Sequence, residues 1–335
     1  MGHTICLGEI LVDCFSEQPG LPRDDVTHWS PLPGGAPVNI ACALAKLGNP
    51  VEFIGAVGAD HWGDALLTLL DDMHVGRRCV QRRHKAPTRQ VYLTKNETGN
   101  DQRNAEQTSF AFAGFSESDP VIFADAHLFA NALEADFFVK ANFLLIGTLS
   151  LAYPDTREAV EHALSIASAH NVPILVDVNW RPMFWSKPAE APGRIYDLLR
   201  QVQFLKISES EADWLFGTLS ARTIAHQFPQ LKGVLVTAGD QVSGGNGVHY
   251  CFRQVIGHVP SFEVDVEDVA GASDAFTAGF VHQLLKQGTL CLDDETKANE
   301  VVRYASAMGA LATTRPGAIA ALPTANEVDV FLYLN

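Results

Sequence analysis

The stretch DVAGASDAFTAGFVHQLLKQG, residues 268–288, joins a loop of small residues to an amphipathic helix. Within it, Phe276, Phe280 and Leu284 recur at a spacing close to the helical repeat, and Gly288 provides a stop. One face of such a helix is apolar and must be covered by another layer of the fold. We therefore expect this helix to pack against a β-sheet whose strands come from elsewhere in the chain.

Short runs rich in β-branched residues supply the strands of that sheet. The expected buried strands cover residues 5–12, 143–146, 174–178, 203–207 and 234–237. Helical patterns alternate with them, among them residues 37–47, with proline at the first helical position, and residues 155–170, with acidic residues in the first turn. This alternation predicts an α/β fold with a mostly parallel central sheet.

Two stretches interrupt the alternation, residues 13–33 and residues 89–113. The first is rich in proline and polar residues, and the second contains apolar residues that alternate as in a strand. We interpret them as a small β-sheet lid that covers a ligand cleft and excludes water when it closes. The remaining residues, 1–12, 34–88 and 114–335, then form the main domain.

Composition excludes several classes of protein. The formal net charge is −15 over 335 residues, whereas proteins that bind nucleic acid need a basic face. The six cysteines include no CxxC pair, a spacing that suits a reducing cytosol better than a disulfide scaffold or a zinc site. No run of about 18 apolar residues predicts a membrane span, and the start of the chain lacks the basic region of a signal peptide. We expect a cytoplasmic protein that binds small molecules.

Two common nucleotide motifs are missing from the sequence. No GxGxxG follows an expected strand, so a dinucleotide fold is not predicted. No GxxxxGK[ST] is present either, which excludes a Walker-type phosphate loop. Any nucleotide must therefore be held in another way.

The loop Gly271-Ala272-Ser273-Asp274 has the features of an anion site that also carries a base. Free backbone N–H groups and the positive end of the helix dipole converge at a helix N-terminus, which suits a phosphoryl group. Asp274 in the first turn should stay ionised beside these donors and could accept the proton of an attacking hydroxyl. The simpler alternative is a helix capped by the Ser273 side chain.

Near the N-terminus, Asp13 and the run Gly34-Gly35-Ala36-Pro37-Val38-Asn39 suggest a site for a hydroxylated ligand. Asp13 should lie beyond the carboxyl end of the first strand, where a carboxylate can accept two sugar hydroxyls. Gly34 and Gly35 permit a close approach of the backbone, and Asn39 faces the same space. The alternatives are a turn or helix cap for Asp13 and a plain turn with a bracing amide for the others.

A second polar cluster follows the strand at residues 174–178. Asp177, Asn179 and Arg181 alternate, so they would project to one side if the strand continued. The guanidinium of Arg181 suits a phosphate or a carboxylate, but an Asp–Arg pair bracing a loop fits equally well. Further on, Ser208 and Glu211 match both a capping box and a carboxylate that orients hydrated Mg²⁺.

Taken together, these motifs resemble the PfkB family of ribokinase-like carbohydrate kinases. The family signature D-T-T-G-A-G-D-(A/S)-F is matched from Asp268 onward, except that Val269, Ala270 and Ser273 replace two threonines and a glycine. The resemblance implies a three-layer α/β/α sandwich with Asp274 as the catalytic base and the Gly271, Ala272 and Ser273 amides as the anion hole. If position 273 needs a positive φ, serine costs about 1–2 kcal/mol, whereas at negative φ its hydroxyl adds a donor.

Further segments resemble the same family and define the two ends of a cleft. The run Asp177-Val178-Asn179-Trp180-Arg181 with Trp185 is similar to an element of fructokinases, which implies that it contacts the substrate together with Asp13, Gly34, Gly35 and Asn39. On the nucleotide side, the resemblance implies a role for Lys206, Ser208, Thr237, Gly239, Ala305, Ser306 and Gly317, with Glu211 near Mg²⁺. Ala113 and Gly114 stand where fructokinases have Tyr-Arg.

The resemblance implies an ATP- and Mg²⁺-dependent sugar kinase, with fructose phosphorylated at O6. It also implies a homodimer formed through the lid, and a K⁺ requirement stays open. Two alternatives remain: a kinase for 2-keto-3-deoxygluconate or a nucleoside, and a weakened sugar-binding regulatory protein, suggested by Ser273.

Overall fold

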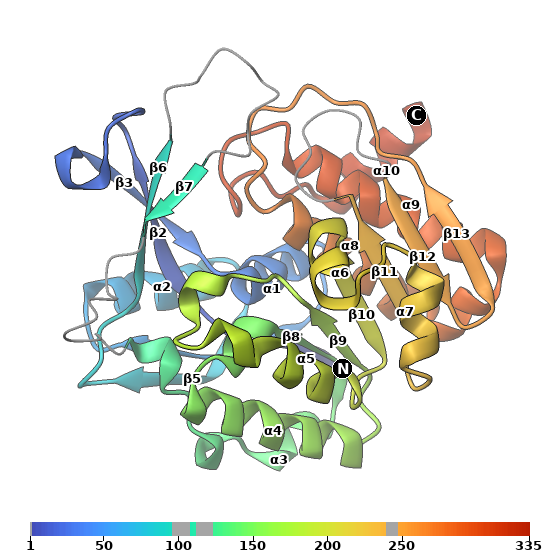
Figure 1. Ribbon diagram of the computed structural model, residues 1–335, viewed down its shortest axis with the longest axis horizontal. Coiled ribbons are helices and arrows are strands. Elements are labelled where there is room, and N and C mark those ends of the chain that lie inside the picture. Colours follow the sequence, from blue (N-terminus) through green and yellow to red (C-terminus); the bar gives the residue numbers. More distant parts are fainter. Residues whose placement is uncertain (1, 96–107, 112–122, 239–246) are drawn as a thin grey trace.

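A large, mostly parallel sheet forms the centre of the computed structural model, which describes residues 2–95, 108–111, 123–238 and 247–335 (Figure 1). In the described part its spatial order is β13 (Val255–Val259), β12 (Val248–Phe252), β11 (Gly233–Thr237), β10 (Phe204–Ser208), β9 (Ile174–Asp177), β8 (Ala141–Gly147), β1 (His3–Leu7), β4 (Val51–Gly58) and β5 (Gly76–Arg83). Neighbours from β11 to β5 run parallel, and β12 and β13 add an antiparallel end. The strand order reverses between β1 and β8, which is where open α/β sheets bind ligands.

Helices cover both faces of this sheet and complete three layers (Figure 1). One hydrophobic core joins the sheet to α1 (Ala36–Lys46), α2 (His61–Asp72), α8 (Ala272–Gln287), α9 (Glu295–Ala312) and α10 (Ala325–Leu334). The other joins it to α3 (Ala135–Phe138), α4 (Pro154–Ala169), α5 (Ala191–Leu199), α6 (Glu209–Phe216) and α7 (Ala221–Gln227). On β1, Cys6 belongs to the first core and Ile5 and Leu7 to the second, as expected from the alternation of side chains along a strand.

Short 3-10 turns connect these elements. They are η1 (Arg23–Asp25), η3 (Ala124–Ala126), η4 (Ala130–Ala132), η5 (Thr148–Leu151), η6 (Pro182–Phe184), η7 (Pro188–Glu190) and η8 (Thr289–Asp293). All six cysteines are unpaired and buried. A search of the described helices finds none with the length and apolar character that a membrane span needs.

A second sheet stands beside the large one (Figure 1). Its described strands lie in the order β3 (Trp29–Gly34), β2 (Leu11–Ser16), β6 (Gln90–Lys95) and β7 (Thr108–Ala111). Two separate stretches of the chain thus meet in one small sheet, through the parallel pair β2 and β6. The predicted fold class, a mostly parallel sheet between helices with an added small sheet, is confirmed. The division of the chain into two domains at the stated residues stays a prediction.

Two expected strands end earlier than the sequence indicated. The single strand predicted over residues 5–12 is wrong, because β1 ends at Leu7 and the chain enters β2 of the small sheet at Leu11. Both segments are buried and apolar, so hydrophobicity alone does not reveal the break between the two sheets. The strand predicted over residues 174–178 ends at Asp177. Asn179 and Arg181 therefore lie on a loop and do not continue a strand.

Candidate active site

The N-terminus of α8 is fixed by a loop whose shape requires glycine at one position. Gly271 has φ +76, and a Cβ there would lie 2.8 Å from the Cβ of Ala318. The Asp268 carboxylate holds the loop from both sides, accepting the Ala270 N–H at 3.0 Å and the Gly317 N–H at 2.8 Å. Because N–H groups in the first turn of a helix have no partner within the helix, they can bind an anion here.

Ser273 lies inside the first turn of α8 and does not cap the helix. The N-cap is Gly271, without a side-chain hydrogen bond, so the capping alternative for Ser273 is wrong. The described non-glycine residues with positive φ are His74, Asn171, Asn179 and Arg253. Ser273 is therefore accommodated without left-handed strain, and its Oγ contacts the ammonium of Lys206.

Asp274 is buried and is held by an asparagine from α1. Its Oδ2 accepts a hydrogen bond from Asn39 Nδ2 at 2.8 Å, and its exposed fraction is 9%. Burial raises the pKa of Asp274 to about 7, and the hydrogen bond from Asn39 only partly opposes this. The expectation that helix-end donors keep this carboxyl fully ionised is therefore wrong. A pKa near neutrality is instead what an efficient general base needs.

Lys206, Asp177, Thr277 and Ser273 form a closed ring of polar contacts. Lys206 Nζ donates to Asp177 Oδ1 at 3.1 Å, across the parallel pair of β9 and β10. Thr277 Oγ1 lies one turn after Ser273 and contacts both Asp177 Oδ2 at 2.9 Å and the Ser273 carbonyl at 3.0 Å. Desolvation opposes the charge of Lys206, but Asp177 and Glu211 outweigh it and raise the pKa of the amine. A buried cation thus lies beside the anion-binding end of α8.

Asp13 on β2, an inner strand of the small sheet, lies close to Gly34 at the end of β3 and to Gly35 just after it. Asp13 belongs to β2 and not, as expected, to the end of the first strand of the large sheet. A Cβ on Gly34 would lie 2.0 Å from Asp13 Oδ2, and one on Gly35, at φ +112, would lie 2.7 Å from the Glu9 carbonyl oxygen. Burial raises the pKa of Asp13 to about 7, opposed by the charge of Arg181. Only glycine leaves room for the Asp13 carboxylate.

Asn179 and Arg181 lie on the loop after β9, and the charge of Arg181 acts on this space. Asn179 has φ +39, a left-handed conformation that turns the chain after the strand. Arg181 donates from Nη1 to the Trp180 carbonyl at 3.0 Å, and its charge lowers the pKa of both Asp13 and Asp274. Arg181 therefore acts on both carboxylates, and within the described residues it forms no ion pair that braces a loop.

Both carboxylate oxygens of Glu211 are already hydrogen-bonded. Oε2 accepts the Ser208 N–H at 2.8 Å in a complete capping box, and Oε1 accepts the Trp180 N–H at 2.5 Å. The indole of Trp180 stacks on that of Trp214 in α6, with ring centroids 4.4 Å apart. The capping alternative for Ser208 and Glu211 is realised, and each Glu211 oxygen keeps a second lone pair that could face a hydrated metal ion.

The residues expected on the nucleotide side have mixed environments. Thr237 ends β11, while Gly239 lies outside the described residues, as do Ala113 and Gly114. Ser306 Oγ donates to the Val302 carbonyl at 2.9 Å within α9. Ala305 is 0% exposed and packs on Gly279 of α8, so its side chain cannot touch a ligand in this conformation.

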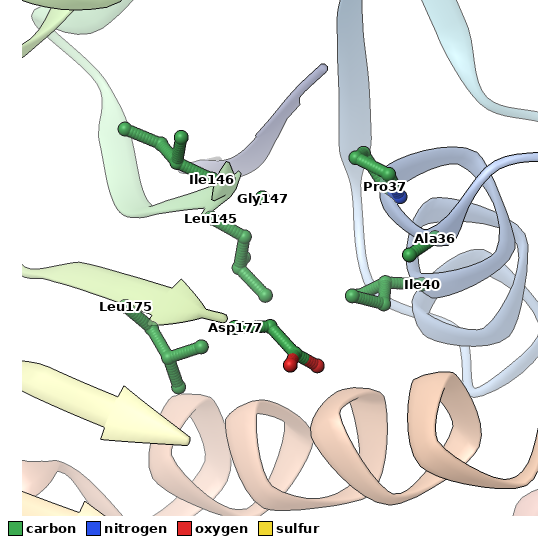
Figure 2. Close-up of a pocket in the computed structure, with 8 residues that line it drawn as sticks. All are labelled: Ala36, Pro37, Ile40, Leu145, Ile146, Gly147, Leu175 and Asp177. Carbon is green, nitrogen blue, oxygen red and sulfur yellow. The ribbon is translucent and has the colours of Figure 1, made fainter. Parts of the chain in front are cut away.

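A cavity of about 10 Å³ lies between α1 and the carboxyl ends of β8 and β9. Figure 2 shows Ala36, Pro37 and Ile40 on one side of it and Leu145, Ile146, Gly147 and Leu175 on the other. The Asp177 carboxylate lies between these two groups (Figure 2). Such a volume corresponds to about one water molecule. The cavity lies near the point where the strand order of the large sheet reverses, between β1 and β8.

Sequence reasoning missed Thr277 and Glu9. Thr277 lies one helical turn after Ser273, so a check for polar residues at that spacing would have found it. Glu9 lies within an apolar stretch of the sequence, yet its carboxylate accepts the Ala36 N–H at the start of α1. A glutamate between two apolar strands itself indicates a specific interaction, because glutamate is seldom buried without a partner.

The model of the pfkB family of carbohydrate kinases matches residues 1–325. This chain belongs to that family. Among its relatives, fructokinase-1 of Zea mays is 31% identical over 328 residues, which cover 97% of this chain and 96% of the maize protein. The matched residues include Asp274 and its neighbours, so this part of the chain also belongs to a family of carbohydrate kinases.

Two solved structures resemble this pfkB-family chain over its whole length. A fructokinase from Xylella fastidiosa with bound ATP is 29% identical, with TM-score 0.85, and the match covers 99% of this chain and 98% of that one. A putative ribokinase II from E. coli, solved with ATP and Mg²⁺, has TM-score 0.82 at 24% identity with full coverage of both chains. The second likeness concerns the fold alone, which is a ribokinase-like sandwich.

Proposed function

We propose that this protein is an ATP-dependent sugar kinase that converts D-fructose and ATP into D-fructose 6-phosphate and ADP. The observation that carries the proposal is the buried Asp274, at the N-terminus of α8, with its carboxylate held by Asn39. A base, the first-turn amides of α8 and a buried cation then occupy one point of the fold, although the Ala272 N–H also donates to the Val269 carbonyl at 3.3 Å. Its family and its fructokinase relatives favour the same reaction.

In this mechanism Asp274 accepts the proton of the sugar O6 hydroxyl as that oxygen attacks the γ-phosphorus of ATP. The bond between the γ-phosphorus and the bridging oxygen breaks, and ADP leaves with that oxygen. The amides of Gly271, Ala272 and Ser273 face the charge that develops on the transferred group, and Lys206 adds a positive charge. Asp13 and Asn39 would hold the sugar, because the Asn39 Oδ1 atom is buried without a hydrogen-bond partner among the described residues and the Asp13 carboxyl is buried near the charge of Arg181.

We expect Mg²⁺ to enter this site together with the nucleotide phosphates. The described residues contain no group of three acidic, histidine or cysteine side chains that could hold a metal, and each Glu211 oxygen already accepts one hydrogen bond. Glu211 would hold the ion through a water molecule, with Ser208 and Thr237 at neighbouring strand ends. When bound, Mg²⁺ supplies charge neutralisation on the phosphates.

An ADP-release assay with three acceptors tests the proposal. Purified protein is incubated with ATP, Mg²⁺ and either fructose, 2-keto-3-deoxygluconate or adenosine, in KCl and in NaCl. We expect turnover with fructose and the product phosphorylated at O6. Turnover with either other acceptor alone would assign the site to that substrate. No turnover with any acceptor, combined with retained sugar binding, would favour a regulatory role.

We also propose a homodimer formed through the small sheet and a cytoplasmic location. Leu32 on β3 is 40% exposed, which leaves an apolar side chain on that sheet for a second copy to cover. The six unpaired cysteines suit a reducing compartment. Light scattering of the wild type and of Leu32→Asp tests the dimer, and cell fractionation tests the location.

A further inference from the structure

A buried ion pair lies where the small sheet joins the main body. Arg89 Nε donates to Asp125 Oδ2 at 2.7 Å, and both side chains are 2% exposed. Arg89 Nη2 also donates to the Tyr153 hydroxyl at 3.0 Å. The residue before β6 is thereby joined to η3, which follows β7 in the sequence. The pair connects the two ends of the inserted strands.

Glu9 lies beside this ion pair. In the described part of the chain one of its carboxylate oxygens accepts a hydrogen bond and the other has no partner. Oε1 accepts the Ala36 N–H at 3.2 Å, and the exposed fraction of Glu9 is 5%. Among the described residues Oε2 is buried without a partner, as are Asp125 Oδ1 and Ser150 Oγ. These three groups line one cavity that has no room for a water molecule. Two carboxyl groups and a hydroxyl thus meet with fewer donors than acceptors.

A proton on Glu9 supplies the missing donor. The charged and titratable groups around it are Arg89 and Asp125 from the ion pair, Tyr153 before α4, and Asp274 from α8. Burial raises the pKa of Glu9 to about 8, and the charges of Asp125 and Asp274 add to this. An ionised Glu9 would place an uncompensated charge in a space without solvent.

Glu9 also determines where α1 begins. Its Oε1 holds the first residue of α1, and Gly35 crosses directly over its carbonyl oxygen. The Asn39 N–H bonds the Gly35 carbonyl at 3.0 Å, and Asn39 Nδ2 holds Asp274. A shift of Glu9 would therefore move Asn39 and, with it, the base.

We propose that Glu9 is a positioning residue that works as a neutral carboxylic acid. One oxygen fixes the start of α1, and thus Asn39 and Asp274, while the protonated oxygen packs against the Arg89–Asp125 ion pair. The catalytic part of this inference rests on the proposed kinase function. The protonation part does not, so the two parts are tested separately.

The first experiment compares kcat and KM for fructose in Glu9→Gln and Glu9→Ala. Glutamine keeps the acceptor oxygen and replaces O–H by N–H, so we expect kcat within about threefold of the wild type, near the lower end of the roughly two- to tenfold effect of one neutral hydrogen bond. Alanine removes the support of α1, and we expect kcat to fall up to about 10²-fold, as for a small misplacement of catalytic groups. Equal losses in both variants, or no loss in either, would overturn the positioning role.

The second experiment needs no kinase activity and follows the folding constant of the wild type and of Glu9→Gln against pH. The wild type binds one extra proton on folding between about pH 5 and about pH 8, so its stability falls as pH rises through that window. We expect the ratio of the Glu9→Gln constant to the wild-type constant to rise about tenfold per pH unit there and to level off above it.

A matched control is Glu161→Gln, which changes an exposed glutamate on α4. The ratio of the Glu161→Gln folding constant to the wild-type constant should not change over the same pH window. A flat ratio for Glu9→Gln as well would overturn the protonated state, even if the protein proves to be an active kinase. If the ratio of the Glu9→Gln folding constant to the wild-type constant rises steeply with pH but the protein has no kinase activity, the protonated state of Glu9 is supported. Only the proposed function is then refuted.

Discussion

The two ends of the candidate site differ in how completely their polar groups are satisfied. At the phosphate end, Lys206, Asp177, Thr277 and Ser273 bond one another in a ring. At the sugar end, the Oδ1 atom of Asn39 is buried without a partner in the part of the chain that the structure describes, and burial raises the pKa of Asp13 against the opposing charge of Arg181. The phosphate end is complete without a ligand, whereas the sugar end requires one.

This difference separates reaction chemistry from substrate choice. A ring of satisfied groups on strand ends and a helix keeps its geometry whatever sugar is bound, which favours transition-state stabilisation. Unpaired buried groups discriminate strongly, because a ligand without the matching hydroxyl leaves them unsatisfied. Changes at the phosphate end should therefore reduce turnover or stability, and changes at the sugar end should alter the KM for the sugar.

The largest effect is expected from Asp274→Asn. The amide cannot accept the hydroxyl proton, so kcat should fall by about 10²–10⁴-fold, the usual contribution of a general base. ATP binding, measured by calorimetry, should stay close to that of the wild type. The exposed Asp265→Asn is the control for a lost charge in the preceding segment. Wild-type turnover in Asp274→Asn would show that the base lies elsewhere.

Lys206→Met tests whether the ring is a single unit. Removing the cation leaves Asp177 buried without a counter-charge, and the free energy of unfolding should fall by about 3–5 kcal/mol. Denaturant unfolding measures the loss. The double variant Lys206→Met, Asp177→Leu should recover much of it, since an apolar pair replaces the ion pair. A double variant as unstable as the single one would mean that the two side chains act independently.

Asp13→Asn addresses the sugar end alone. Loss of a charged acceptor for hydroxyl groups should raise the KM for fructose about 10- to 100-fold, from the roughly 1.5–3 kcal/mol of a hydrogen bond to a charged group. The KM for ATP and the kcat should change little. Initial rates over a matrix of both substrates separate these quantities, and a similar rise in both KM values would contradict the division into two ends.

The pH dependence of kcat/KM reports the state of Asp274 in the free enzyme. Because burial raises its pKa to about 7, the rate should fall about tenfold per pH unit as the solution becomes more acidic than that. Folding stability should change in the opposite sense. The folded protein binds the extra proton between about pH 4 and the raised pKa, so stability falls as pH rises through that window. A rate that is level from pH 5 to 8 would contradict the raised pKa.

Ser273→Gly should have the smallest effect. It removes the hydroxyl that contacts Lys206, which is worth about 0.5–1.5 kcal/mol, so the KM for ATP should rise about two- to tenfold. Ser273→Ala separates the hydroxyl from the added backbone freedom of glycine. A large gain of activity in Ser273→Gly would instead show that serine weakens the anion hole.

Sequence reasoning located the elements better than their connections. Helix starts such as Pro37 and stops such as Gly288 depend on local chemistry, and the structure places α1 and α8 within a residue or two of the expectation. The transfer of the chain from β1 to β2 was not predictable from hydrophobicity, because residues on both sides of Glu9 are buried. Sheet membership depends on long-range pairing that a single sequence does not encode locally.

For the site, a local motif predicted which residues matter but not how they contact one another. Asp274 and Asn39 are 235 positions apart, and no local pattern indicates their hydrogen bond. The raised pKa of Asp274 follows from burial by elements distant in sequence, which is why the helix-end argument predicted the wrong charge state. In contrast, the Ser208 and Glu211 capping box was correctly predicted, because all of its atoms lie within one turn.

The stacked indoles of Trp180 and Trp214 lie directly beside Glu211, and the Trp180 backbone is bonded to that carboxylate. Any rearrangement of Glu211 therefore alters the mutual orientation of two chromophores. If nucleotide binding moves Glu211, the fluorescence of these two indoles should change, and stopped-flow measurements on unlabelled protein would then time the arrival of nucleotide.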